Sequence, residues 1–417
     1  MKKEAKTLFC FFAMVFAMLL FIGSALSQAG MKCVEGVQSG QSAESHYRIC
    51  MPPADHYNGR FIIWAHGFQD ANTEVGIPEE QLCFDWGCIP DLVVGMGFGF
   101  ATNSYRKTGL AVREGMEDIL DLVENLTSYS TGTNGTSIVP SEPTKLYIIG
   151  ASEGGLIATL LVEQHPKIFT AGYALCGPIG DFPLQINYLG DARVTFEYFF
   201  PNAIPGYGIF NDRYYNNDHD AVPPDWDLYF ESTILPLLKK HPLKARQWAK
   251  VAKLPYDPAD YFTTVLNSAK DVLRYSVINM PDAIEVLGGQ PFDNHRKWYT
   301  GSSNDFLLNW KVKRFRADSE AIAEMKTFYN TTGVLDSPLV TMHTLRDPQV
   351  PYWHETLYNL KTIAAGSFLK YHYNIPIDRY GHCNFTLEEA MGGFSLMLLY
   401  AGDWEILSSL ETYMQAQ

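Results

Sequence analysis

One stretch near the middle of the chain, residues 145–162, constrains the fold more than any other. It opens with the apolar, largely β-branched run Leu146–Ile149, which predicts a buried strand. It continues through Gly150-Ala-Ser152-Glu-Gly154 into residues at helical spacing. A G-x-S-x-G sequence between a strand and a helix is typical of a sharp turn that raises the serine hydroxyl above a sheet edge. We therefore expect Ser152 to be a nucleophile; the alternative is a glycine-rich turn whose serine has no chemical role.

Predicted strands alternate with predicted helices along most of the chain. This alternation favours a mostly parallel, doubly wound α/β sheet with the Ser152 turn in its middle. The predicted strands are 47–51, 61–65, 98–103, 146–149, 169–175, 339–343 and 371–373. The clearest helices outside the central stretch are 112–123 and 394–400.

One segment, residues 181–335, interrupts the alternation. It contains helical patches and a dense aromatic run from Phe196 to Tyr215. A helical, aromatic insertion between core strands predicts a cap over the carboxyl edge of the sheet, where open α/β sheets bind ligands. The core would then comprise residues 28–180 and 336–417. We expect most of the aromatic side chains to build the cap's own core and the others to line a substrate pocket. The helical patches are 228–238, 259–273 and 306–328.

The N-terminus predicts export. Residues 1–6 are basic, residues 8–20 are almost entirely apolar, and small residues follow at 25–29. This pattern is typical of a secretory signal peptide, here residues 1–27, although the apolar run is almost long enough to remain as an anchor. No later run is comparable, so we expect a secreted or periplasmic protein with no stable membrane insertion after cleavage.

Charge and motifs argue against several other classes of protein. The formal charge is −14, which disfavours a nucleic-acid partner because phosphate contacts need clustered cations. Gly95-x-Gly97-x-Gly99 lacks the spacing of a dinucleotide fingerprint and precedes a strand, so no cofactor is predicted. Acceptor side chains cluster at 211–220, but no EF-hand pattern is present. We predict no metal site.

Six cysteines remain beyond the predicted signal peptide. An even number in an exported protein favours three disulfides. Our preferred pairing has two local bonds and one long-range bond, although sequence alone does not decide among the possible pairings. The preferred pairs are Cys33–Cys50, Cys83–Cys88 and Cys176–Cys383.

Two residues could complete a catalytic site with Ser152. A serine hydroxyl needs a base to take its proton, and the base needs an acid that fixes its tautomer. On a fold with this turn the expected order is serine, acid, histidine. Asp347 follows the predicted strand 339–343, and His382 follows the predicted strand 371–373 and its loop. Alternatively, Asp347 only forms a turn before Pro348, and His382 is a surface or buried histidine without a catalytic role.

Other histidines and acids compete less well. His372 falls inside a predicted strand, and His354 begins a predicted helix. Asp378 precedes the proposed base by only four residues and is poorly placed to reach its ring. His343 and Asp347 are too close in sequence to form the acid–base pair of this fold.

An oxyanion hole is expected beside Ser152. In this kind of site it combines the backbone N–H after the serine with one from the loop after an early strand. These groups would be the N–H of Glu153 and the N–H of Phe68, with His66-Gly67 forming the loop after strand 61–65. We expect the His66 side chain to hydrogen-bond the loop itself.

Together these residues resemble the α/β-hydrolase superfamily. The resemblance rests on Gly150–Gly154, the loop at 66–67, Asp347 and His382 in this order, and it covers most of the chain except the cap. Among its members, secreted esterases and lipases with a helical cap are the most similar. The resemblance implies that Ser152 is the nucleophile, His382 the general base and Asp347 its orienting acid.

The His382-Cys383 step is also similar to tannases and feruloyl esterases, in which a disulfide joins neighbours of the catalytic serine and histidine. This chain departs from that pattern, because Ala151 rather than cysteine precedes Ser152. The resemblance implies a carboxylic ester hydrolase acting on a small-molecule or polymeric ester. A propeller-less peptidase of the prolyl-oligopeptidase type, or a non-catalytic binding protein on the same fold, remains an alternative.

Overall fold

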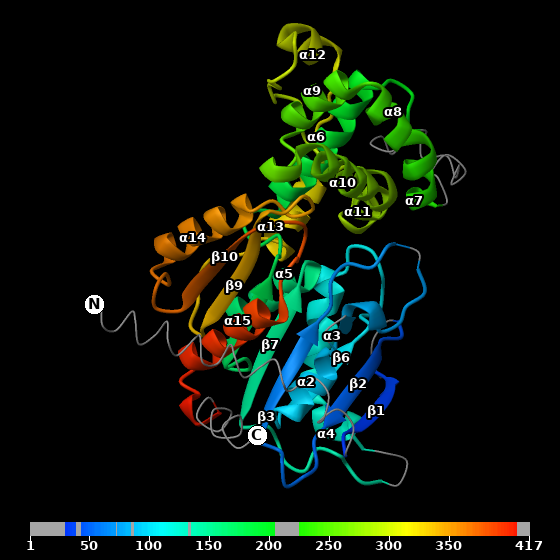
Figure 1. Cartoon of the computed structure of the whole chain (residues 1–417). Helices are drawn as coiled ribbons and strands as arrows, with labels where there is room; N and C mark the ends of the chain where they lie inside the picture. Colours follow the sequence, from blue (N-terminus) through cyan, green and yellow to red (C-terminus); the bar gives the residue numbers. More distant parts are fainter. Residues whose placement is uncertain are drawn as a thin grey trace.

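The computed structural model describes residues 30–38, 43–71, 73–84, 87–131, 135–204 and 225–406. Its centre is an eight-stranded sheet in the order β1-β2-β6-β3-β7-β8-β9-β10 (Figure 1). Six neighbouring strands are parallel to one another, in the order β6, β3, β7, β8, β9 and β10. At the edge beside β6, β2 pairs antiparallel with β6, and β1 pairs antiparallel with β2. A separate hairpin contains β4 and β5. The strands are β1 (Lys32–Val37), β2 (His46–Met51), β3 (Arg60–Ala65), β4 (Cys83–Phe84), β5 (Gly87–Cys88), β6 (Gly99–Asn103), β7 (Lys145–Ala151), β8 (Ala171–Leu175), β9 (Leu339–Arg346) and β10 (His372–Tyr380).

Helices cover both faces of this sheet. Along β3, Phe61, Ile63 and Ala65 pack into one core, and Ile62 and Trp64 pack into the other. The first core includes residues of α3, α5 and α14, and the second includes residues of α2 and α15. A sheet buried on both faces explains the continuous apolar sequence of its central strands. These helices, with the short α4 and η2, are η2 (Glu79–Gln81), α2 (Ile89–Gly95), α3 (Val112–Glu124), α4 (Leu126–Tyr129), α5 (Glu153–Gln164), α14 (Trp353–Ala365) and α15 (Leu387–Tyr400).

The chain between β8 and β9 forms a long helical insertion. Helices α6 to α12 gather beyond one end of the sheet, and α13 lies close to it (Figure 1). They include two π-helical segments, η6 and η8. The helices are α6 (Phe182–Phe199), α7 (Trp226–Tyr229), η6 (Phe230–Ile234), α8 (Leu235–Lys240), α9 (Pro242–Ala252), η7 (Pro258–Asp260), α10 (Tyr261–Arg274), η8 (Tyr275–Asn279), α11 (Met280–Val286), α12 (Asp305–Lys311) and α13 (Ser319–Phe328).

The predicted mostly parallel, doubly wound sheet is confirmed, and every predicted strand is present with shifted ends. The largest error is at β10, which was predicted as 371–373 but continues through Pro376 to Tyr380. Because β10 is an edge strand, a proline that cannot donate to the ladder is tolerated there. The predicted helix 306–328 is two helices, α12 and α13, and α6 was not predicted as a helix.

The structure contains the three expected disulfides. Cys33–Cys50 joins β1 to β2, Cys83–Cys88 closes the small hairpin, and Cys176–Cys383 joins the end of β8 to the segment after β10. The predicted signal peptide, the acceptor cluster at 211–220 and the aromatic residues Tyr207, Phe210, Tyr214 and Tyr215 lie outside the described residues. Within the described part of the chain, no helix combines the length and the apolar character needed to span a bilayer.

Candidate active site

The turn between β7 and α5 holds Ser152 in a backbone conformation that side chains rarely adopt. Its φ is 57° and its ψ is −120°. The turn is so tight that a Cβ on Gly150 would lie 2.1 Å from the Gly154 carbonyl oxygen, and a Cβ on Gly154 would lie 2.0 Å from the carbonyl oxygen of Ala65. Both glycines are therefore required by close backbone packing, and the strain is of the kind found at functional sites.

Three side chains from distant parts of the sequence meet above this turn. The Nε2 of His382 lies 2.9 Å from the Oγ of Ser152, and its Nδ1 lies 2.7 Å from the Oδ2 of Asp347. Ser152 follows β7, Asp347 follows β9 and His382 follows β10, so each lies just beyond the carboxyl end of a parallel strand. A ring that donates from Nδ1 to a carboxylate leaves Nε2 free to accept a proton from the serine.

Asp347 is anchored by its own loop. Its side chain is fully buried, and its Oδ1 accepts hydrogen bonds from the N–H groups of Gln349 and Val350 at 2.8 and 3.0 Å. Burial by itself would raise the pKa of this carboxyl, but the neighbouring His382 and His343 rings outweigh burial and hold the pKa below its ordinary value. Asp347 is therefore an anion in a fixed orientation.

The segment between β8 and β9 also holds the Asp347 loop from the other side. The hydroxyl of Tyr188 donates to the carbonyl oxygen of Pro348 at 2.8 Å, and the Gln185 amide donates to the carbonyl oxygen of Gln349 at 2.8 Å. The hydroxyl of Tyr275 donates to the side-chain oxygen of Gln349 at 3.0 Å. The helices α6 and η8 are thus tied directly to the loop that carries the acid.

Two backbone N–H groups are available where the sequence predicts an oxyanion hole. Within the described residues, neither the N–H of Glu153 nor that of Phe68 donates to another protein group, whereas the N–H of Gly67 is taken by Gln81 Oε1 at 2.7 Å. His66 Nδ1 hydrogen-bonds the Gly67 carbonyl at 2.7 Å, and burial lowers the pKa of His66 to about 4. A neutral His66 that holds its own loop agrees with the role expected from sequence.

A mostly apolar pocket opens beside Ser152. Its free volume is about 690 Å³ including its mouth. One wall comes from α6, with Phe182, Ile186 and Leu189, and another from η8 and α11, with Tyr275 and Met280 among others. The site therefore combines the polar group of Ser152, Asp347 and His382 with a mostly apolar pocket, which is the usual composition of a small-molecule site.

The Glu153 side chain is the ionisable group closest in sequence to the nucleophile. It lines the same pocket, is 6% exposed, and accepts a hydrogen bond from the Ala111 N–H at 3.0 Å. Burial, supported by the nearby carboxyls of Asp282 and Glu114, raises the pKa of Glu153 to about 8. At neutral pH the pocket wall here is an uncharged carboxylic acid.

The competing residues occupy other places. His372 and His354 are buried in the network behind β9 and do not reach Ser152, and Asp378 pairs with Arg346 at the surface. His343, in contrast, lies 3.3 Å from Asp347 Oδ2. The two side chains are in contact because the turn after β9 folds Asp347 back toward its own strand, but His382 and not His343 is the ring beside Ser152.

The Cys176–Cys383 disulfide lies beside the base. Cys383 follows His382 directly, and its Sγ is 3.6 Å from the His382 Nε2. Both cysteines have positive φ, 46° and 47°. The bond therefore restrains the backbone on which the imidazole is mounted. Among the described residues these cysteines and His382 form the one compact group of metal-ligand type, but their sulfurs are already bonded to each other.

Some residues of the site carry no signal in a single sequence. Gln81, which orders the loop at Gly67, and Gln185, which holds the acid loop, belong to no motif. They act through long-range contacts that only the folded chain brings together. His343 and Asp347 lie four residues apart in the sequence, but residues at this spacing in an extended strand are not expected to be in contact.

The strand order, the turn at Ser152 and the insertion between β8 and β9 are those of an α/β hydrolase, and the chain has this fold. The sequence matches no protein-family model, and no curated protein is significantly similar to it in sequence.

Solved structures are similar at the level of the fold. The tannin acyl hydrolase from Aspergillus niger matches with a TM-score of 0.50 and 11% identity over 89% of this chain and 78% of that one. A bacterial heroin esterase matches with a TM-score of 0.45 and 12% identity over 93% and 89% of the two chains. The Pyrococcus horikoshii acylaminoacyl peptidase matches with a TM-score of 0.44 and 12% identity over 93% of this chain, which spans only 43% of the peptidase.

Proposed function

We propose that this protein is a secreted serine hydrolase that cleaves carboxylic esters through an acyl-enzyme on Ser152. The observation that carries the proposal is the placement of His382, within hydrogen-bond distance of both Ser152 Oγ and Asp347 Oδ2. A serine becomes nucleophilic at neutral pH only when such a base takes its proton. The free N–H groups of Glu153 and Phe68 supply the second requirement, a site for the oxyanion.

The acylation step follows from these positions. His382 Nε2 takes the proton of Ser152 as Oγ attacks the ester carbonyl carbon, and the carbonyl oxygen becomes an oxyanion held by the two backbone N–H groups. The buried Asp347 anion stabilises the imidazolium that forms. Collapse of the tetrahedral intermediate breaks the bond to the alcohol oxygen, which receives the proton from His382 Nε2. The acyl group is then bonded to Ser152.

Deacylation repeats the sequence with water. His382 removes a proton from a water molecule as its oxygen attacks the acyl carbon, and the second tetrahedral intermediate uses the same oxyanion hole. When this intermediate collapses, the proton returns from His382 to Ser152 Oγ and the carboxylic acid is released. No cofactor takes part in this scheme.

We also propose that residues 181–335 act as a cap that selects the substrate. The support is that α6, η8 and α11 supply most of the apolar pocket walls, and that α6 and η8 are hydrogen-bonded to the Asp347 loop. Apolar walls favour uncharged esters with an aliphatic or aromatic portion, because a charged group would lose its hydration without a partner. Export is inferred from the signal-like residues 1–27 and agrees with three disulfides.

The test is a matched pair of serine variants. Ser152→Ala should abolish most hydrolysis of a nitrophenyl ester and prevent labelling by a fluorophosphonate probe. Ser337→Ala, which removes another buried hydroxyl with its own hydrogen bond to Pro166, should leave both unchanged. Hydrolysis that persists in Ser152→Ala would refute the assignment. A peptide amide assayed beside the ester distinguishes an esterase from a peptidase.

A further inference from the structure

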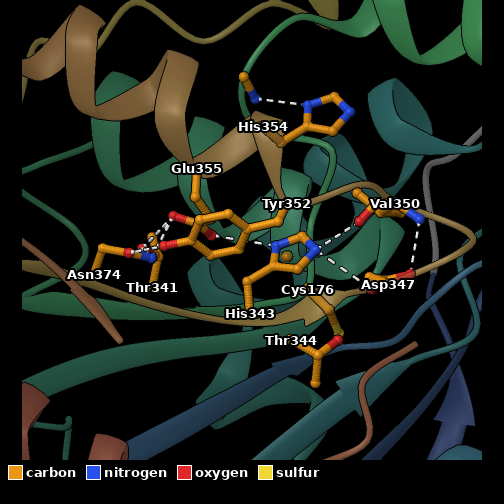
Figure 2. Close-up of polar contacts among 12 residues, drawn as sticks. Cys176, Thr341, His343, Thr344, Asp347, Val350, Tyr352, His354, Glu355 and Asn374 are labelled. Atoms are coloured by element: carbon orange, nitrogen blue, oxygen red, sulfur yellow. Dashed lines mark hydrogen bonds and ion pairs between the residues drawn. The ribbon is translucent and has the colours of Figure 1, made fainter. Parts of the chain in front are cut away.

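A second histidine contacts the proposed catalytic acid from inside the protein. His343 lies in β9, is fully buried, and has its Nε2 3.3 Å from the Oδ2 of Asp347 (Figure 2). The same Oδ2 receives the Nδ1 of His382 at 2.7 Å. One carboxylate oxygen is thus shared between the proposed base, His382, and a second, fully buried histidine ring.

The contacts of the two ring nitrogens of His343 indicate where its protons lie. Nε2 also lies 2.7 Å from the Val350 carbonyl oxygen, which can only accept, so Nε2 carries a hydrogen. The other nitrogen, Nδ1, faces Oε1 of Glu355 at 3.4 Å. Neither of these two buried atoms has a hydrogen-bond partner among the described residues. A bare nitrogen and a bare carboxylate oxygen would repel each other, whereas a proton on the nitrogen would make the contact attractive.

The rest of Glu355 shows which oxygen is free for this contact. Its Oε2 accepts hydrogen bonds from the Thr341 hydroxyl and the Asn374 amide, both at 2.7 Å (Figure 2). Oε1 is therefore directed to His343. Glu355 is fully buried, and its Oε1 has no hydrogen-bond partner among the described residues, so the His343 ring is the group placed to compensate this oxygen.

Electrostatics favour placing the shared proton on the imidazole. Burial alone would lower the pKa of His343, but the hydrogen bonds and charges of Asp347 and Glu355 outweigh burial and raise the pKa well above its ordinary value. Two carboxylates surround one ring, so the cation is the group they both stabilise.

Several other titratable groups lie around this ring and its partner Asp347. Burial lowers the pKa of His354 on α14 and that of His372 on β10, so both rings are neutral. Burial also raises the pKa of Asp271 on α10, which faces Asp347. The remaining neighbours are the base His382, the phenol of Tyr352, whose ring is edge-on to His343 at 5.9 Å, and the phenol of Tyr188.

We propose that His343 is a positioning residue: held by Glu355 as a buried imidazolium, it fixes Oδ2 of Asp347 and keeps that carboxylate anionic for His382. The proposal rests on the assignment of Ser152, Asp347 and His382 as the catalytic groups. The pair of His343 and Glu355 is neutral as a unit, so it orients the acid without adding net charge behind the active site.

The first measurement needs no turnover. In ¹⁵N-labelled Ser152→Ala protein, a histidine side-chain ¹H–¹⁵N spectrum should show both ring nitrogens of His343 protonated from pH 6 to pH 8. The signals are assigned by their contacts to the Tyr352 ring and by their loss in His343→Gln. A neutral His343 with one ring proton at pH 7 would overturn the proposal even if Ser152→Ala is inactive.

The second measurement is the pH profile of ester hydrolysis. His343→Gln leaves the buried Glu355 without its cation and loosens Asp347, so kcat should fall about ten- to a hundredfold. The acid limb of kcat/KM should move to higher pH by about one unit, because the added negative charge favours the protonated base. His372→Gln removes a buried neutral ring from the same network and should not move the limb.

These outcomes separate the possible failures. A His343→Gln enzyme with the wild-type profile and kcat would overturn the inference, as would a limb that moves equally in His372→Gln. If His343→Gln does not fold, as judged by its thermal unfolding, the spectrum of the Ser152→Ala protein alone decides. Hydrolysis that survives in Ser152→Ala would instead refute the proposed function and leave the protonation state of His343 measurable.

Discussion

Replacing Glu153 by glutamine tests the electrostatics of the pocket wall. The carboxyl is buried next to the nucleophile, and burial first of all, with Asp282 and Glu114 adding to it, raises its pKa from 4.5 to about 8. In the unfolded chain the group ionises near pH 4.5. Its contribution to stability is therefore fully present below about pH 4.5 and is lost as the pH rises through about 8.

The size of the effect follows from the two pKa values. One pKa unit corresponds to about 1.4 kcal/mol, so the stability from Glu153 should fall by about 1.4 kcal/mol per pH unit and by about 5 kcal/mol over the whole window. Glutamine does not titrate, and its amide oxygen can still accept the Ala111 N–H. The free energy of unfolding of the wild type minus that of Glu153→Gln should therefore fall by several kcal/mol between pH 4 and pH 9.

Urea unfolding with the disulfides intact measures this difference at pH 5, 7 and 9. The surface change Glu124→Gln, on the exposed side of α3, is the matched control and should give a difference that stays flat across the same range. A flat difference for Glu153→Gln would show that the carboxyl is ionised throughout. That result would refute the conclusion that the pocket wall beside Ser152 is uncharged at neutral pH.

Three further outcomes are expected. Asp347→Asn should lower kcat by about 10⁴, because the proposed base loses its orienting anion; a loss under tenfold would contradict the role of the acid. Replacing Cys176 and Cys383 by serine should lower the free energy of unfolding by about 3–5 kcal/mol and should lower kcat. The same change at Cys83 and Cys88, which close a short loop, should lower the free energy of unfolding less and leave kcat unchanged. Equal effects of the two pairs on kcat would exclude a special role for the Cys176–Cys383 bond. In a panel of nitrophenyl esters, uncharged acyl groups should exceed carboxylate-bearing ones by about tenfold or more in kcat/KM, and equal rates would contradict an apolar pocket.

The parts of the fold that sequence predicts well are local or follow from topology. The turn at Ser152 is a continuous pattern of strand, small residues and helix. Asp347 and His382 were found because each follows a strand, and parallel strands deliver their carboxyl ends to one edge. The large sequence separation of Ser152, Asp347 and His382 did not prevent this prediction, because the sheet brings the strand ends together.

Other parts were missed for identifiable physical reasons. Helix α6 is buried on nearly every side, and its buried residues include polar ones such as Asp191 and Arg193. Its sequence therefore lacks the one-sided apolar period by which a surface helix is detected. Strand β10 was cut short because a proline normally ends a strand, and only its position at the sheet edge permits Pro376. The contact of His343 with Asp347 depends on a turn whose geometry is set by backbone donors to the aspartate.

The tight packing at Gly150 and Gly154 restricts which amino-acid substitutions this part of the molecule can tolerate. A single methyl group at either position would collide with main-chain atoms, so the segment bearing the nucleophile has almost no room for variation. The pocket-lining side chains of α6 and α11, such as Ile186 and Met280, come from elsewhere in the chain and are not part of this turn. Under the proposed function, natural drift or laboratory selection would change the range of accepted esters through substitutions in the pocket walls, while the turn that carries Ser152 stays the same.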